Sequence, residues 1–177
     1  AATGYYALAG EVCSGLENKE FAVYFQPQYN IYTNEIVGAE ALLRWEHPKR
    51  GIILPEVLIP ILADSNQLSK FENFVFEEIC HFLALRLALG LQVFPISCNF
   101  SFEHFKDENF INSLKETADK HNVPHKLLVV ELAERLLADD VNFAGMQVDE
   151  LKNQGFKIAV DNFGAGYLSL RILSDIS

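Results

Sequence analysis

Glu40 and Arg44 place a carboxylate and a guanidinium four residues apart in a segment that otherwise has the pattern of a buried β-strand. Side chains alternate along a strand, so Glu40, Leu42 and Arg44 belong to one face, beside apolar neighbours. A charge in such a strand is costly unless it meets a partner or a metal ion. This strand is therefore a strong candidate site, although a lone glutamate there can also be an edge or ion-paired residue without a function.

Three later segments repeat this arrangement, each an apolar run that ends in an oxygen-bearing side chain. The runs end at Asn99, Glu131 and Asp161, and each step of roughly 30 residues is the length of one strand plus one helix. Helical patterns at 106–121 and 139–153 separate the runs. Repeated strand–helix units predict a parallel sheet, and α/β folds build their sites at the carboxyl ends of such strands.

The polar ends of these strands form an all-oxygen set of possible ligands, Glu40, Asn99, Glu131 and Asp161. Hard oxygen ligands suit Mg²⁺ or Mn²⁺ better than zinc. Two such ions can activate a water and stabilise the leaving oxygen of a phosphodiester. Asn162 can serve a second ion as a neutral ligand, and Arg44 can hold a phosphate or a guanine edge. Singly, Asn99 can equally cap a helix and Asp161 can order the glycine loop, but the combination favours a metal site.

The order of elements predicts an α/β fold with one inverted strand. Strands at 21–29 and 36–45 are joined by a short turn and must form an antiparallel hairpin. Helices are expected at 5–18, 55–65, 69–90 and 167–174. The sequence thus has five strands, whereas an eight-stranded barrel takes ~250 residues. Either the sheet is open, or the chain stops before its barrel closes.

Composition limits the function classes. The chain has 177 residues, 50% of them apolar, and a net charge of −10, which disfavours general DNA, RNA or anionic-membrane binding but not a small phosphate held by metal ions. Cys13, Cys80 and Cys98 lack ligand spacing and are expected to be reduced, buried thiols of a cytoplasmic protein. No signal peptide or membrane segment is expected. The first residue is Ala, so we expect a piece of a longer protein.

Several stretches resemble the EAL domain family, the bacterial cyclic-di-GMP phosphodiesterases. They lie in family order and cover nearly the whole chain. The matching stretches are Tyr24–Pro27, Ile36–Trp45, His47-Pro48 with Gly51 and Pro55, Cys98–Ser101, Val130–Glu134, Asp161–Tyr167, and Ser169-Leu170.

This resemblance implies a TIM-like (β/α)8 barrel with one antiparallel strand, here incomplete at its C-terminus, with about five of eight strands. Residues 1–20 would be a lead-in segment and residues 21–177 a truncated EAL domain. The implied reaction is hydrolysis of cyclic-di-GMP to linear pGpG with two Mg²⁺ or Mn²⁺ ions. An upstream sensory domain is expected in the whole protein.

The resemblance also assigns roles residue by residue. Glu40, Asn99, Glu131 and Asp161 match the family's metal ligands, and Glu40, Asp161 and Asn162 are the catalytic candidates. Gln26, Leu42 and Arg44 match positions near the substrate. The loop from Phe163 to Ser169 matches the segment that couples the site to dimerisation, so a homodimer is expected.

The chain departs from the family at three positions. Asn162 stands where the family usually has a second Asp, Ala133 replaces a usual Thr, and Leu168 replaces a usual Ser. The family's later lysine, loop glutamate and final glutamine have no counterpart before Ser177, so these residues alone are expected to catalyse poorly or not at all. The alternative function is a degenerate EAL module that binds cyclic-di-GMP or a partner protein without turnover. Another metal-dependent barrel enzyme acting on a small anion is a more distant third.

Overall fold

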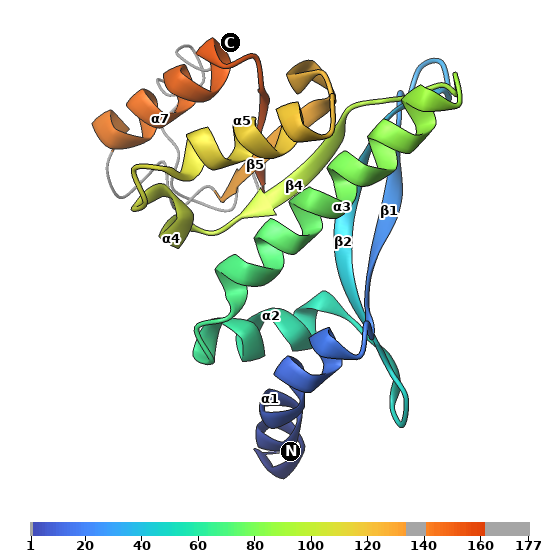
Figure 1. Cartoon of the computed structure of the whole chain (residues 1–177), viewed down its shortest axis with the longest axis vertical. Coiled ribbons are helices and arrows are strands. Elements are labelled where there is room, and N and C mark those ends of the chain that lie inside the picture. Colours follow the sequence, from blue (N-terminus) through green and yellow to red (C-terminus); the bar gives the residue numbers. More distant parts are fainter. Residues whose placement is uncertain (1, 134–140, 162–177) are drawn as a thin grey trace.

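A computed structural model describes residues 2–133 and 141–161. Helices and strands alternate through most of this range (Figure 1). In chain order they are α1 (Ala2–Glu17), β1 (Phe21–Tyr29), β2 (Ile36–His47), β3 (Gly51–Ile53), α2 (Pro55–Asp64), α3 (Leu68–Ala88), β4 (Ile96–Phe100), α4 (Phe102–Phe105), α5 (Phe110–Lys120), the 3₁₀ helix η1 (His125–Leu127), β5 (Leu128–Ala133), α7 (Val141–Asn153) and β6 (Lys157–Asp161).

The strands form one mixed sheet in the order β1-β2-β4-β5-β6, with the short β3 paired to β2. β1 and β2 are antiparallel, as the short turn between them predicts, and the β2–β4, β4–β5 and β5–β6 pairs are parallel. The parallel pairs follow from the helical crossovers between their strands. The predicted α/β architecture with one inverted strand is confirmed.

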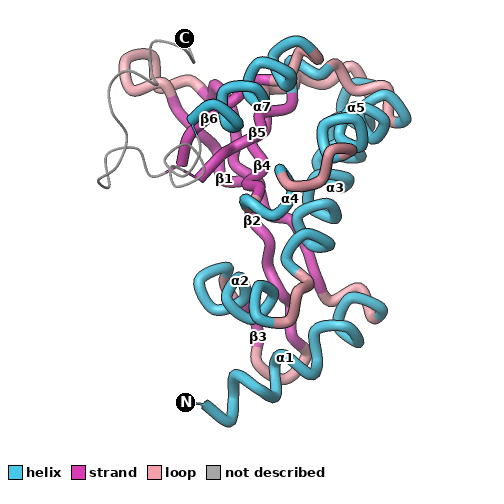
Figure 2. Tube along the Cα trace, turned by 90° about the vertical axis from the view of Figure 1, so that its left-hand side faces the viewer, coloured by secondary structure: helices cyan, strands magenta, loops and turns pink. Residues whose placement is uncertain are grey.

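Helices cover one face of this sheet. α3 runs across β1, β2 and β4, α5 packs beside α3, and α7 packs on β6; Figures 1 and 2 show these helices on the same side. Buried side chains at alternate strand positions meet them, including Ala41, Leu43, Cys98, Val130 and Leu132. The other face carries Glu40, Asn99 and Glu131, which are only partly buried. The helices therefore pack against one face of the sheet to form the core, and the opposite face carries the candidate site residues.

β2 and β4 separate at the point where the site begins. Their ladder contains two aligned pairs, Ala39 with Ile96 and Glu40 with Ser97. β2 pairs with β1 on its other edge from Ile36 to Trp45, and with β3 only from Trp45 to His47. The space between the diverging strands is bordered by α2 and α3. The sheet thus opens a pocket at the carboxyl ends of its parallel strands.

Two predicted boundaries were wrong. The helix expected at 106–121 begins only at Phe110, as α5, because Asp107 Oδ1 accepts a hydrogen bond from the Asn109 N–H at 2.9 Å and forms a turn before it. The short helix α4, which ends before residue 106, was not predicted. The apolar run that ends at Asn99 forms a strand only from Ile96, since Pro95 has no N–H for a ladder. β3 was not predicted, because a strand of three residues is too short to show the alternation of apolar and polar side chains. The helix expected at 167–174 lies outside the described residues.

The cysteines follow the expectation in part. Cys80 and Cys98 are buried free thiols, whereas Cys13 is exposed. Burial raises the pKa of the Cys80 thiol to about 12. In the described ranges, no helix is long and apolar enough to cross a membrane.

Candidate functional site

The strand register places the predicted ligands in one row across the sheet. Glu40 aligns with Ser97, and Asn99 lies two residues further along β4 and aligns with Glu131. On β6, Asp161 lies two residues beyond Ala159, the partner of Glu131. Steps of zero or two residues keep the face of a strand unchanged. The four predicted positions therefore belong to the same face of the sheet. From β2 to β6, each is either level with the previous one or two residues further toward the carboxyl end.

Glu40 and Asn99 are in direct contact. Asn99 Nδ2 donates a hydrogen bond to Glu40 Oε1 at 2.9 Å, across a sequence separation of 59 residues. This bond turns the amide nitrogen toward the carboxylate and leaves the amide oxygen Oδ1 as an acceptor or ligand. One carboxylate oxygen of Glu131, Oε2, is buried. The structure thus brings Asn99 into contact with Glu40 and aligns Glu131 with Asn99 on the neighbouring strand; we call these three residues the oxygen cluster.

The hairpin partner adds a polar side chain opposite Glu40. Gln26 on β1 is the aligned partner of Glu40, and Tyr24 is the partner of Leu42. Opposed residues of an antiparallel pair have Cβ atoms about 5 Å apart. The structure therefore places Gln26 and Leu42 beside Glu40, where the family resemblance expected substrate-contacting residues.

Arg44 lies further along the same strand face. Four residues of strand span about 13 Å, so Arg44 is well separated from the oxygen cluster. Its Nη1 donates to the Leu43 carbonyl at 3.0 Å, and its Cζ lies 5.8 Å from the centre of the Tyr24 ring. Tyr24 in turn donates to Glu46 Oε1 at 3.0 Å, and this bond raises the pKa of the phenol. Arg44 is held over an aromatic ring at a distance that suits a remote part of an extended ligand.

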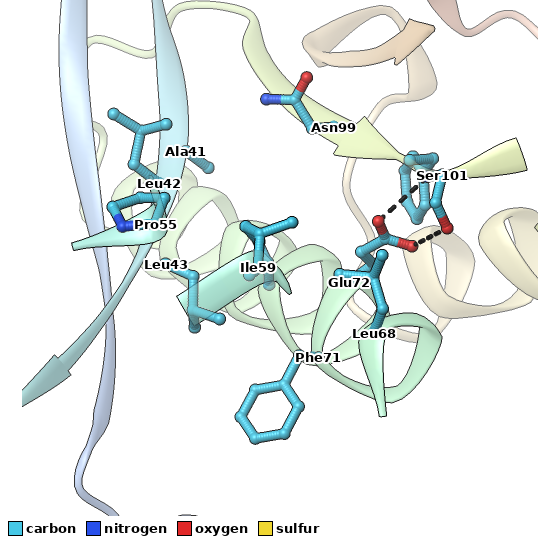
Figure 3. A pocket seen from close by; sticks show the side chains of 12 residues that line it. Ala41, Leu42, Leu43, Pro55, Ile59, Leu68, Phe71, Glu72, Asn99 and Ser101 are labelled. Atoms are coloured by element: carbon cyan, nitrogen blue, oxygen red, sulfur yellow. Dashed lines mark hydrogen bonds between the residues drawn. The ribbon is translucent and has the colours of Figure 1, made fainter. Parts of the chain in front are cut away.

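A pocket of about 320 Å³ adjoins the cluster (Figure 3). Apolar side chains form most of its wall, among them Leu42, Pro55, Ile59 and Phe71. Polar groups at its edge come from Asn99, Glu72 and Ser101. The pocket can bury a flat apolar group while the polar remainder of the same ligand reaches Glu40 and Asn99.

Sequence reasoning missed Glu72, Ser101 and His104 as parts of this region. Ser101 N–H and Oγ both donate to the Glu72 carboxylate, at 3.0 and 2.8 Å. His104 shows no ligand spacing with the other histidines of the sequence, so no pattern marks it. A signal for Glu72 was available, because helical spacing puts it in line with Phe76 and Ile79, on the apolar stripe of α3. An acid on a buried stripe must find partners.

The residues present fit a divalent cation. Two carboxylates and an amide oxygen are hard donors of the type that Mg²⁺ and Mn²⁺ prefer. Ser97 Oγ, level with Glu40, is buried and has no hydrogen-bond partner among the described residues. The described side chains contain no group of three or more His, Cys, Asp and Glu that could hold a metal. A third carboxylate of the predicted set, the side chain of Asp161, is outside the described part, as are Asn162 and the loop from Phe163 to Ser169.

Comparison with known proteins identifies relatives along nearly the whole chain. MucR of Pseudomonas aeruginosa, a bifunctional diguanylate cyclase/cyclic di-GMP phosphodiesterase, is 28% identical over 166 residues, which are 94% of this chain and 24% of MucR. An uncharacterized protein of Mycobacterium bovis is 34% identical over 161 residues, 89% of this chain and 52% of that protein. The chain spans 20–26% of the length of several other curated relatives, including the signaling protein YkoW of Bacillus subtilis.

Solved structures give the same result. The MucR phosphodiesterase in complex with c-di-GMP has a TM-score of 0.89 at 27% identity, covering 96% of this chain and 68% of that one. The EAL enzyme Bd1971, bound to cAMP and cyclic-di-GMP, has a TM-score of 0.84 at 26% identity, covering 99% and 49%. These neighbours are EAL TIM-barrel domains, which confirms the predicted fold class.

The family model described as "EAL domain" matches residues 10–177. This range contains the oxygen cluster, the pocket and every predicted site residue. The chain belongs to the EAL domain family.

Proposed function

We propose that this chain binds cyclic-di-GMP and that the protein carrying it hydrolyses one phosphodiester of this ligand to give pGpG, with Mg²⁺ or Mn²⁺. The observation that supports this most is the contact of Asn99 with Glu40, level with Glu131, at the point where the parallel ladder of β2 and β4 ends in an EAL domain. Relatives described as a cyclic di-GMP phosphodiesterase and as enzymes bound to c-di-GMP support the choice of substrate.

Divalent cations, when bound, supply the charge that activates a water and stabilises a leaving oxygen. Glu40, Asn99, Glu131 and Asp161 would hold them. Asn99 orients the Glu40 carboxylate through its 2.9 Å hydrogen bond, so that one Glu40 oxygen is fixed in place. A carboxylate held by an amide on the neighbouring strand keeps its geometry, which is what a multidentate site requires.

The remaining parts of the site would hold an extended dinucleotide. Cyclic-di-GMP has two bases and two phosphates, so its binding site must be longer than a single metal cluster. Arg44, about 13 Å along the strand from Glu40, would meet a remote phosphate or base edge, because a guanidinium presents five N–H donors. The apolar wall of Pro55, Ile59 and Leu42 would cover one base.

A second candidate function is binding without turnover. Asn162 stands where the family usually has an aspartate, and loss of that charge would weaken a second cation and raise the pKa of a water bound to it. Such a module would retain the pocket and Arg44 and would report the concentration of cyclic-di-GMP to a partner.

Incubation of the full-length protein with cyclic-di-GMP and Mn²⁺, followed by chromatographic separation of the nucleotides, tests the enzyme proposal. We expect pGpG to form, and we expect EDTA or Glu40→Ala to abolish it. Glu35→Ala is the matched control, because Glu35 is an exposed glutamate of the same hairpin. Calorimetric titration of cyclic-di-GMP into the same proteins measures binding.

Binding without any pGpG would establish the second candidate in place of the first. Absence of both binding and turnover would overturn the two together. Equal turnover by Glu40→Ala and by the wild-type protein would remove Glu40 from the mechanism.

A further inference from the structure

Glu72 on α3 holds the chain immediately after β4. Its two carboxylate oxygens accept two hydrogen bonds from Ser101, one from the backbone N–H at 3.0 Å and one from Oγ at 2.8 Å (Figure 3). His104 Nε2 lies 2.9 Å from Glu72 Oε2, at ion-pair distance but without hydrogen-bond alignment. We call these three residues, Glu72, Ser101 and His104, the Glu72 clasp.

The clasp is largely shielded from water. The side chains of Glu72 and His104 are 12% and 6% exposed. The His104 ring packs at right angles to Phe100, with ring centres 5.1 Å apart, and against Phe110 at 4.6 Å. Hydrogen bonds to a shielded carboxylate are stronger than those at a surface, and loss of one partner leaves a costly unsatisfied group. The clasp therefore fixes the geometry of the residues that it joins.

Asn99 lies between the two points where α3 holds β4. On one side of it, Cys98 Sγ lies 4.0 Å from the Glu72 carbonyl oxygen, and on the other side Ser101 bonds the Glu72 carboxylate. Ser101 occupies the N-cap position of α4, but its hydroxyl does not cap that helix. The hydroxyl, which could satisfy a helix terminus, is used instead for the contact with α3.

We infer that Glu72 is a positioning residue for Asn99. Through Ser101, the Glu72 clasp fixes the end of β4, and this holds the Asn99 amide against Glu40 across the point where β2 and β4 separate. The ladder between those strands ends at Glu40 and Ser97, so backbone pairing with β2 does not extend to Asn99. The consequence for cation binding rests on the proposed function, whereas the consequence for the Asn99–Glu40 bond does not.

The Asn99 side-chain amide gives a direct readout in ¹H–¹⁵N NMR, where its signal is identified by its loss in Asn99→Asp. In Glu72→Gln we expect the Nδ2 proton that is bonded to Glu40 to exchange with water faster than in the wild-type protein, because this bond opens more often. Ser101→Ala should do the same, and Ser101→Thr, which keeps the hydroxyl, should restore slow exchange. This pair replaces Glu72→Gln if that variant does not fold.

Glu77→Gln is the matched control. Glu77 lies on the same helix and, like Glu72, has a histidine beside its carboxylate: His121 Nε2 and Lys120 Nζ each lie 2.8 Å from its Oε1. Glu77→Gln should alter the stability of the protein through a change on α3, and it should leave the exchange rate of the Asn99 amide unchanged. Equal exchange in Glu72→Gln, Ser101→Ala and the wild-type protein would overturn the inference, as would an equal effect of Glu77→Gln.

Titration of Mn²⁺, followed by the EPR signal of the free ion, connects the clasp to the proposed function. Residues that orient a ligand typically change metal affinity by about 10–100-fold, and we expect Glu72→Gln to lie in that range while Glu77→Gln binds as the wild-type protein does. A wild-type protein that binds no Mn²⁺, together with faster Asn99 exchange in Glu72→Gln, would sustain the positioning role and overturn the proposed cation site. If Glu72→Gln keeps the wild-type Asn99 exchange rate and the wild-type affinity for Mn²⁺, the positioning role would be overturned and the proposed cation site would be sustained.

Discussion

Single residues set the negative charge with which this site would attract cations. Glu40 and Glu131 contribute two carboxylates in the described part of the site, and Asn99 contributes an amide that is already directed at Glu40. Affinity for hard divalent cations rises with the number of charged ligands. The neutral side chain at Asn162 is therefore the substitution with the clearest electrostatic consequence.

Restoring the missing charge should strengthen the site. In Asn162→Asp we expect the affinity for Mn²⁺ to increase on the order of tenfold, because one more carboxylate joins the ligand set. Calorimetric Mn²⁺ titration of the wild-type protein and the variant measures this change. An unchanged affinity would mean that position 162 does not contribute to the cation site.

The sequence predicted some side chains of this site and not others, for a physical reason. Glu40, Asn99 and Glu131 could be found because each interrupts an apolar strand, where a polar group is conspicuous. Glu72 lies in a helix that carries other acids, such as Glu77 and Glu78; its place on the apolar stripe directs it toward the core, and the fold shows that its partner there is Ser101. His104 was overlooked because its partner is distant in the sequence.

At the scale of elements, the end of β2 is anchored by Trp45. This side chain is fully buried and stacks on Phe21, with ring centres 5.0 Å apart. Its Nε1 donates to Glu20 Oε2 at 2.9 Å. Trp45 therefore fixes the strand that carries Glu40, Leu42 and Arg44 against the core.

Removal of this anchor should be among the most destabilising single changes. We expect Trp45→Ala to lower the free energy of unfolding by about 3–5 kcal/mol, and Glu20→Gln, which keeps an acceptor for the indole, by about 1 kcal/mol or less. Urea denaturation followed by far-UV circular dichroism is suitable, since Trp45 is the single tryptophan of the chain. A similar loss in both variants would show that burial of the ring is not the main contribution.

α1 is joined to the end of β2 by a hydrogen bond between His47 and Glu11. His47 is 4% exposed, its Nδ1 accepts from the Lys49 N–H, and its Nε2 lies 2.8 Å from Glu11 Oε2. The hydrogen bond from His47 lowers the pKa of Glu11 below its ordinary value of 4.5. A carboxyl group whose pKa is lowered in the folded state stabilises the fold at pH values above its ordinary pKa. This contribution is lost as the pH falls through the lowered pKa.

The stability difference between the wild-type protein and Glu11→Gln should follow the same pH dependence. We expect the wild-type protein to have the higher urea midpoint at pH 6 to 7, about two units above the ordinary carboxyl pKa, and the difference to shrink as the pH falls below 4.5. Glu17→Gln, at an exposed position of α1, should show no such trend. A difference that grows on acidification would reverse the assigned sign.

Most elements were predictable because their hydrophobic periods are long and clear. The hairpin of β1 and β2, the helix α3 and the strands β5 and β6 lie within a few residues of their predicted bounds. β3, α4 and the turn before α5 were not predicted. β3 has three residues and α4 has four, which is too short to show a hydrophobic period, and the turn depends on the hydrogen bond between Asp107 and Asn109.

For the whole molecule, the described sheet has two ends. β1 and β6 are the terminal strands of its order, and each presents backbone groups along one side. Exposed apolar side chains are also present at the hairpin tip and beyond α3, including Ile31, Tyr32 and Leu89. Unpaired strand edges and apolar patches promote association.

These 177 residues, prepared alone, should therefore associate. Sedimentation velocity at increasing concentration is expected to show species larger than one chain, because edge strands pair with other chains. A single species of monomer mass across the concentration range, together with a cooperative thermal transition, would contradict this prediction.

Glu40, Asn99, Glu131 and Asp161 are proposed to hold divalent cations together. A crystal of the protein grown with Mn²⁺ tests this by anomalous diffraction. We expect anomalous peaks within coordination distance of these four side chains, on the sheet face that Glu40 shares with Asn99 and Glu131. A map without a peak there, or with the four side chains directed to different places, would contradict it.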